Sequence, residues 1–219
     1  RQARVWDSER VLLDNIVSVT PNSSLALTNL ADLHESDPLR RLELLDRAVA
    51  ANPYESAAVS SYASALLTVL AKGGAVADGD PAQAKQEVRA GLGLAAAGRM
   101  RDAYRAFLNA VRYAPHNAQA WNNLGAVLLE GGYGERSANA FNLARFLAPE
   151  RLEPRNNLAI AVFAPTRAQE SVTLFEAALV RDVGNAVVRA NLATAQAGLS
   201  ETNSPVPAEK PRFQYLVWQ

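Results

Sequence analysis

The chain has 219 residues and no formal net charge, because 22 lysines and arginines balance 22 aspartates and glutamates. This balance argues against a nucleic-acid-binding surface, which carries a clear excess of positive charge. Cysteine is absent, which excludes disulfides and thiolate metal sites, and no apolar stretch reaches the length that spans a bilayer.

The N-terminal third is predicted to be helical. Four helices are expected, over residues 6–19, 24–35, 38–51 and 55–71. The first directs Trp6, Leu13 and Ile16 inward by their spacing. The fourth has no second helix of its own, because residues 72–80 form a glycine-rich loop. We therefore expect either an extra helix or a kink here, with the concave surface changing direction at the loop.

The rest of the chain up to residue 199 reads as a regular helical array. Its predicted helices are 81–97, 100–114, 118–130, 134–147, 152–163, 167–181 and 186–198. Residues 200–212 are polar and proline-rich, which is typical of an extended linker, and 213–219 alternate with strand periodicity. The predicted division is degenerate N-terminal helices (1–71), a flexible loop (72–80), the regular array (81–199), and a linker with an aromatic tail (200–219).

The array repeats with a period of 34 residues. The columns that keep this step are Phe107, Phe141 and Phe175; Ala110, Ala144 and Ala178; Leu124, Leu158 and Leu192; Asn123, Asn157 and Asn191; and the small residues Gly125, Ala159 and Ala193. Each unit reads as two short helices around a turn. Neither helix can bury its apolar face alone, so the units must stack.

This pattern resembles the tetratricopeptide repeat (TPR) family, specifically over about 84–198 and more loosely over 7–71. The resemblance implies an all-α, right-handed solenoid of about five helix-turn-helix repeats, here with an extended aromatic C-terminal tail. Strings such as N-N-L-G at 122–125 are similar to those of small bacterial envelope proteins that assist pilus and secretin assembly. The first residues are similar to the junction that follows the membrane domain in large membrane proteins with C-terminal TPR arrays, some of them glycosyltransferases.

Catalytic chemistry finds little support. His34 and His116 belong to different segments, and we expect structural or surface roles for both. The glycine-rich stretch 91–98 has no preceding strand and no following Lys-Ser/Thr pair, so helix packing explains it better than phosphate binding. We predict a protein that is not an enzyme and has no cofactor or metal.

Asparagines are the most informative polar residues. In TPR arrays the polar residue just before the repeated leucine points into the concave groove, and here that column reads Arg89, Asn123, Asn157 and Asn191, with Asn122 and Asn156 beside it. Asparagine is a poor helix former, so its repetition indicates a hydrogen-bonding role. It could clamp the backbone of an extended peptide, which we favour, or join neighbouring helices as a structural ladder.

The remaining groove positions indicate an apolar ligand. Lys85 and Arg89 are the only cations in these columns and share one helix, which argues against the carboxylate clamp of chaperone-binding TPR proteins. Leu92, Ala126 and Ile160 make the groove amphipathic. The candidate contact residues of the tail are Phe213, Tyr215, Leu216 and Trp218. The tail could dock on its own groove, dock on a partner or be disordered, and a partner or neighbouring subunit is slightly favoured.

The predicted function is therefore a non-catalytic protein-interaction scaffold or assembly factor that binds a protein or peptide. A bacterial cell-envelope complex, with possible membrane anchoring, is favoured over the cytoplasm, and the oligomeric state is left open. Since the chain begins at Arg1, we expect a signal, lipid anchor or membrane domain upstream. The alternatives are a regulatory or recruiting domain of a larger, glycosyltransferase-like membrane protein, and a structural subunit of a large complex.

Overall fold

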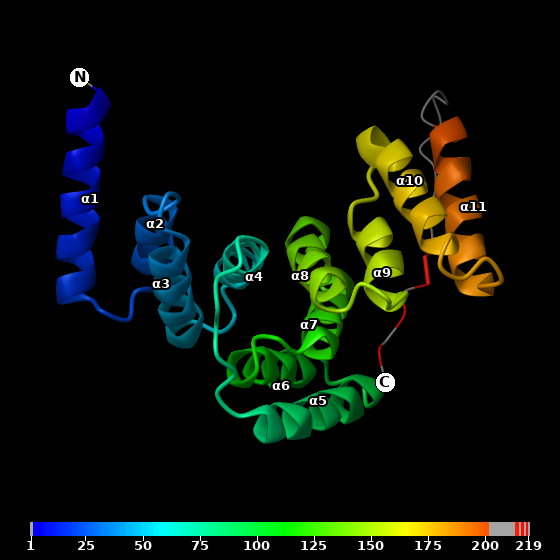
Figure 1. Cartoon of the computed structure of the whole chain (residues 1–219), viewed down its shortest axis with the longest axis horizontal. Helices are drawn as coiled ribbons and strands as arrows, with labels where there is room; N and C mark the ends of the chain where they lie inside the picture. Colours follow the sequence, from blue (N-terminus) through cyan, green and yellow to red (C-terminus); the bar gives the residue numbers. More distant parts are fainter. Residues whose placement is uncertain (1, 202–212, 215, 217, 219) are drawn as a thin grey trace.

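The structure, a computed structural model, describes residues 2–201, 213, 214, 216 and 218, without the side chains of residues 2–8, 165, 200 and 201. This part of the chain contains eleven α-helices, a short 3-10 turn η1 (Pro165–Arg167) and no strand (Figure 1). The helices are α1 (Gln2–Val19), α2 (Ser24–Asp32), α3 (Pro38–Ala51), α4 (Ser56–Ala71), α5 (Pro81–Ala96), α6 (Met100–Tyr113), α7 (Ala118–Glu130), α8 (Gly134–Leu147), α9 (Glu153–Ala161), α10 (Ala168–Leu179) and α11 (Ala186–Glu201). The predicted all-α solenoid is confirmed, and the predicted ends of α3, α7 and α8 coincide with the observed ones.

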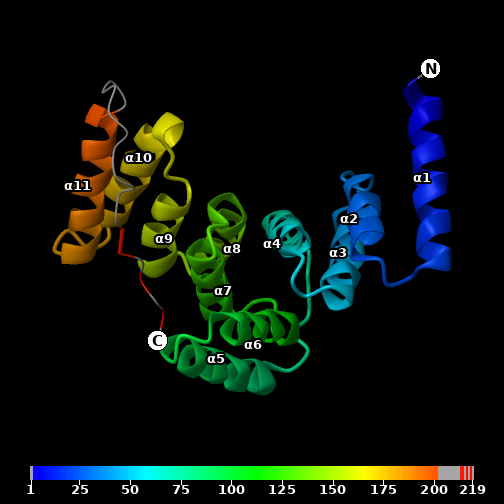
Figure 2. The ribbon, with the colours of Figure 1, turned by 180° about the vertical axis from the view of Figure 1, so that it is seen from behind.

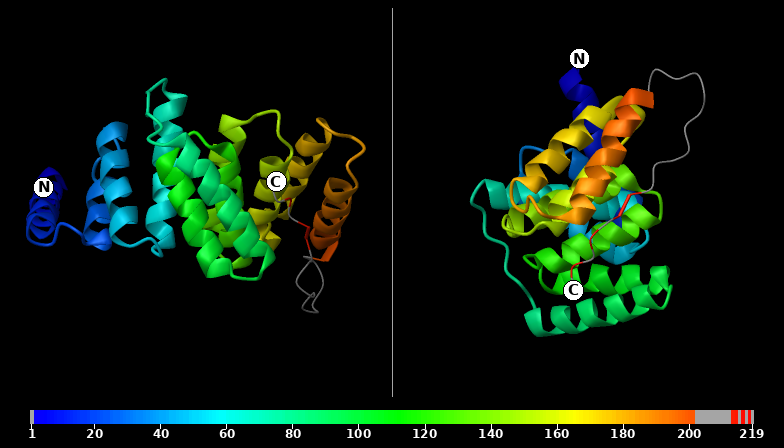
Figure 3. Two further views of the ribbon diagram at one scale, coloured as in Figure 1. Left: turned by 90° about the horizontal axis from the view of Figure 1, so that it is seen from below. Right: turned by 90° about the vertical axis from the view of Figure 1, so that its right-hand side faces the viewer.

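Neighbouring helices pack in pairs, α2 with α3, α5 with α6, α7 with α8 and α9 with α10, and the pairs follow one another along the molecule (Figures 1 and 3). The turns that close α5 and α7 contain Gly98 at φ 74° and Gly132 at φ 83°. Only glycine adopts this left-handed conformation without strain. A glycine in the turn therefore lets the second helix of each pair turn back against the first.

The phenylalanines that recur every 34 residues are buried where the two helices of a pair meet. Phe107, Phe141 and Phe175 are at most 1% exposed. A Cβ atom on Gly91 would lie 2.6 Å from the ring of Phe107, and one on Gly125 would lie 2.7 Å from the ring of Phe141. Both distances are shorter than van der Waals contact, so the two helices of these pairs approach closely because glycine faces phenylalanine.

Two glycine-to-alanine substitutions should therefore have opposite effects. Gly125→Ala is expected to lower the free energy of unfolding by about 1–2 kcal/mol, because overpacking against Phe141 outweighs the better helix propensity of alanine. A Cβ atom added at Gly93 would meet no atom within 4 Å, so Gly93→Ala should raise the free energy of unfolding by up to about 1 kcal/mol. Urea unfolding of both variants measures the difference. Equal effects would show that the close approach of α7 and α8 carries no packing constraint.

Helix α4 has a partner that its sequence position does not reveal. It packs against α3 and against α8, the second helix of a later pair. Asn139 of α8 donates its side-chain amide to the Ser60 hydroxyl at 2.9 Å, and the rings of Tyr62 and Trp121 lie 5.9 Å apart. Helix α4 thus lies beside α8, as Figure 2 shows from behind.

The loop between α4 and α5 is held to the turn between α6 and α7 by hydrogen bonds. The backbone amides of Gly79 and Asp80 both donate to the carbonyl of Tyr113 at 2.8 Å. Asp78 accepts from the backbone amide of His116 at 3.1 Å, and its carboxylate lies 3.0 Å from the imidazole Nδ1. His116 therefore has the structural role expected from its turn.

Helix α1 packs more weakly than predicted. Its main neighbour is α2. Leu13 is buried, but Ile16 is 37% exposed, and Val11, Leu12 and Val19 are also exposed. The predicted inward stripe is therefore wrong at Ile16, because α2, the main described neighbour of α1, does not cover this side chain; the side chain of Trp6 lies outside the described residues. No described helix is long and apolar enough to cross a membrane.

Candidate functional site: the asparagine ladder and the C-terminal tail

The asparagines predicted to face the groove come together on the first helices of successive repeats. We call this set the asparagine ladder: Asn122 and Asn123 on α7, Asn156 and Asn157 on α9, and Asn191 on α11. All of its side chains are at most 1% exposed. A buried amide is costly unless its donors and acceptors are paired, so the partners of these groups define the site.

The amides first bond to one another. Asn191 donates to the Oδ1 atom of Asn156 at 2.9 Å, and Asn157 donates to that of Asn122 at 3.1 Å. Within each helix, Asn156 donates to Asn157 at 3.1 Å and Asn122 donates to Asn123 at 3.2 Å. These bonds connect α11, α9 and α7 through one continuous network, which is the structural ladder that the sequence offered as an alternative.

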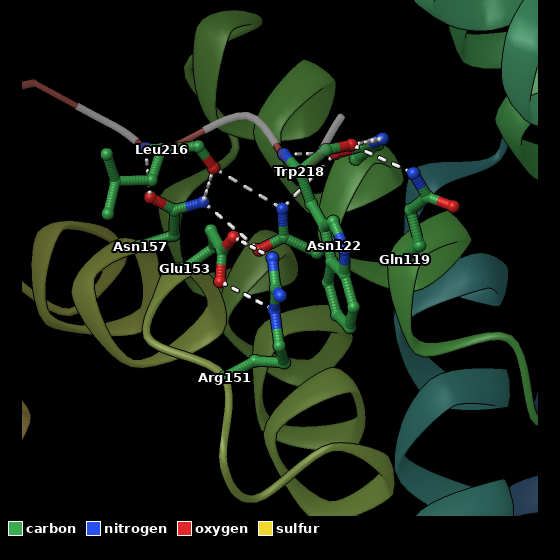
Figure 4. Close-up of polar contacts among 8 residues, drawn as sticks. Gln119, Asn122, Arg151, Glu153, Asn157, Leu216 and Trp218 are labelled. Atoms are coloured by element: carbon green, nitrogen blue, oxygen red, sulfur yellow. Dashed lines mark hydrogen bonds and ion pairs between the residues drawn. The ribbon is translucent and has the colours of Figure 1, made fainter. Parts of the chain in front are cut away.

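The same amides also hold the C-terminal tail by its backbone. Asn191 donates to the carbonyl of Gln214 at 2.7 Å and accepts from its N–H at 2.8 Å. Asn157 bonds Leu216 in the same way, with both distances 2.7 Å (Figure 4). Asn123 does so with Trp218, at 3.0 and 3.2 Å. Each of these three asparagines thus closes a two-bond clamp on one tail residue.

The clamps match the geometry of an extended chain. Each 34-residue step along the solenoid moves the tail by two residues, and the tail runs opposite to the order of the repeats. Two extended residues span roughly 6–7 Å, and the N–H and C=O groups of every second residue face the same side. The side-chain amides therefore replace the neighbouring strand of a sheet.

This arrangement revises two expectations for the tail. The strand periodicity of 213–219 does not indicate a strand in a sheet, because the backbone of the described residues 214, 216 and 218 bonds to side chains and the described tail residues belong to no sheet. Docking on a partner, which was slightly favoured, is not what the structure shows. The described tail residues lie against the asparagine ladder of their own chain.

Aromatic residues fix both ends of the described tail. The ring of Phe213 lies 4.9 Å from that of Phe163 and 6.0 Å from that of Phe175. At the other end, the guanidinium of Arg151 lies 4.5 Å from the centre of the Trp218 ring. Glu153 accepts hydrogen bonds from Arg151 and so orients it beside the indole (Figure 4).

Comparison with known proteins supports the fold assignment. The Sgt2 TPR domain from Aspergillus fumigatus superimposes with a TM-score of 0.54 at 18% identity, over 64% of this chain and 95% of that one. The first TPR domain of Spaghetti (RPAP3), solved with the HSP90 peptide SRMEEVD, gives 0.52 at 17% identity, over 55% of this chain and 98% of that one. This chain has the TPR fold. No family model and no curated protein matches it by sequence.

The other predicted site residues of the TPR array make no hydrogen bond to the described tail residues. Lys85 and Arg89 are exposed on α5, and the structure shows no hydrogen bond or ion pair from their side chains to the described tail residues. Leu92 is partly buried and packs against the core, and Ile160 belongs to the hydrophobic cluster against which Phe213 of the tail packs. Tyr215 lies outside the described residues. The amphipathic groove is therefore built mainly from neutral amides.

Contacts that the sequence analysis did not include complete the TPR groove. Gln119 donates to the carbonyl of Trp218 at 3.2 Å, and it lies one helical turn before Asn123 on the same face of α7. That spacing could have indicated it. Phe175 was assigned to helix packing alone, and Arg151 and Phe163 lie outside the repeated columns, so the 34-residue period gives no sign of them.

The charges near this surface of the TPR array do not form a reactive site. Burial, together with Arg181 and Arg145, lowers the pKa of Arg155, whose guanidinium donates to the carbonyl of Pro149 at 2.6 Å. Among the described residues, no group of histidines and carboxylates is arranged to hold a metal ion. The chemistry available at the ladder is hydrogen bonding to a peptide backbone.

Proposed function

We propose that this protein is a peptide-binding scaffold whose asparagine ladder holds an extended segment of another protein. The observation that carries the proposal is the set of two-bond clamps from Asn123, Asn157 and Asn191 to alternate tail residues. A clamp that bonds only N–H and C=O groups accepts any extended chain, so nothing in it restricts binding to the protein's own tail. The Spaghetti domain, solved with an HSP90 peptide, is a protein of this fold with a peptide ligand.

A synthetic peptide with the sequence of residues 213–219 tests this function. The receptor is the full chain carrying Phe213→Ala and Leu216→Pro, which we call the tail-released variant. Proline has no N–H, so Leu216→Pro removes the donor to Asn157, and Phe213→Ala removes the aromatic contact, while neither substituted residue belongs to a solenoid helix. Calorimetric titration should show one peptide bound per chain. A folded variant that binds no peptide would refute the scaffold function.

Peptide binding should depend only weakly on salt. The clamps contain neutral amides and backbone groups, so screening of charges leaves them unchanged. We expect the Kd of the peptide to change less than about threefold between about 50 and about 500 mM NaCl. A steep fall in affinity with salt would show instead that cations such as Lys85 and Arg89 hold the ligand.

A structural subunit is the second candidate, and one observation favours it. Phe213 packs against the C-terminal hydrophobic cluster that contains Phe175, Val188 and Ala195, so the tail also closes the end of the core. Under this function the tail never leaves the ladder. The wild-type chain would then take up no added peptide even at millimolar concentration, whereas a scaffold would exchange its tail for the peptide.

A further inference from the structure

Resting on the proposed function, we infer that the groove selects partner segments with an aromatic residue at the first position and a second aromatic residue at the sixth, in extended conformation. The tail shows this pattern with Phe213 and Trp218. The partner class is therefore a protein with an exposed aromatic-x-x-x-x-aromatic segment that takes the place of the tail. Between its two ends, the segment would be held through its backbone.

The first position is defined by a contact between rings. Phe163, in the turn after α9, contacts Phe213 edge-to-face, and Phe175 of α10 stacks on it. Gly198 of α11 makes room for this arrangement, because a Cβ atom there would lie 2.8 Å from the Phe163 ring. Ring pairs of this kind add attraction beyond the area they bury, so an aliphatic residue at this position would bind less well.

The sixth position is defined by a cation. Arg151 lies over the Trp218 ring while Glu153, with an 83% buried side chain, holds its guanidinium from the other side. A cation attracts the face of tryptophan most strongly, then tyrosine and phenylalanine. The fixed guanidinium therefore favours an aromatic residue here, with tryptophan preferred.

The positions between the two anchors are read through the backbone. Gln214 bonds Asn191 and Asn156 with its main-chain groups, and the residue itself is exposed. Leu216 is clamped in the same way, and the pocket beside it is open, lined by Glu150, Arg151, Leu152, Glu153 and Asn185. The distance between the anchors is fixed by the clamps, since a shift of one residue would turn the opposite backbone groups to the ladder.

A peptide panel titrated into the tail-released full chain tests this selectivity. Relative to the tail peptide F-Q-Y-L-V-W-Q, replacing its phenylalanine by alanine should weaken binding on the order of 30-fold. Replacing its tryptophan by alanine should weaken it about fivefold. Replacing the exposed glutamine by alanine is the matched control and should change the Kd less than about twofold. Inserting one glycine after that glutamine should weaken binding as much as losing one anchor.

Two receptor variants separate the anchors from the clamps. In the tail-released background, Arg151→Ala should abolish the preference for tryptophan over alanine and leave the phenylalanine preference intact. Gly198→Ala should do the reverse by displacing the Phe163 ring.

The outcomes that contradict the two proposals are different. Equal affinity for all peptides would overturn the selectivity but not the scaffold function. If no peptide binds to a folded receptor, the scaffold function itself is refuted. A wild-type dimer in sedimentation, lost in the tail-released variant, would make a second copy of the chain the occupant and overturn the inference.

Discussion

Asn157→Ala is expected to release the tail and to lower the free energy of unfolding by about 2–4 kcal/mol. The substitution removes both bonds to Leu216, together with the bonds to Asn122 and Asn156. Each buried donor or acceptor that loses its partner lowers stability by about 1–3 kcal/mol, and this loss is smaller where water can bond to the exposed group. Hydrogen exchange at the Leu216 amide should become as fast as in a free peptide. Asn157→Asp should release the tail too, because it replaces the donor to the Leu216 carbonyl by an acceptor.

Asn142→Ala is the matched control for this prediction. Asn142 lies on α8 and bonds only Arg145 within the described contacts, so its removal should change stability by no more than about 0.5 kcal/mol. It should leave exchange at Leu216 unchanged. Slow exchange at Leu216 in the Asn157→Ala chain would contradict the role of the ladder, since the tail would then be held by its aromatic ends alone.

The repeat made most of the fold predictable. A 34-residue period places Phe141 and Leu124 on buried faces wherever the helices end, so the solenoid followed from local patterns. The asparagines could be assigned to the groove face because three of them keep the same period. The sequence could not show that the same amides join the repeats and also clamp a backbone. Each amide has enough donors and acceptors for both roles, so only the structure shows that both occur together.

Contacts outside the repeat could not be predicted. The packing of α4 on α8 joins residues about 80 positions apart, such as Ser60 and Asn139, and no period relates them. The same holds for Arg151 and Trp218, which meet only because the tail runs back over α7 and α9. The proposed roles of the groove residues and the envelope location stay predictions, since they depend on partners and not on the fold.

Releasing the tail should raise the affinity for added peptide about 100-fold over that of the wild-type chain. A tail on the same chain competes at an effective concentration on the order of 1 mM. Against a peptide that binds the free groove with a Kd on the order of 10 µM, this competition lowers the apparent affinity by about two orders of magnitude. Fluorescence polarisation of a labelled 213–219 peptide, titrated with wild-type and tail-released chains, measures the ratio.

The same competition links peptide binding to stability. A tail that acts as a tethered ligand stabilises the folded chain by about 2.7 kcal/mol at 100 times its Kd, so the tail-released variant should lose about that much. Saturating free peptide should restore it, since the peptide makes the same clamps with Asn123, Asn157 and Asn191. A chain that carries both the tail-release substitutions and Asn157→Ala serves as the control. Free peptide should stabilise it less than it stabilises the tail-released variant. Lost stability that no peptide restores would assign the tail to the core, and the protein would then be a structural subunit whose groove is permanently filled.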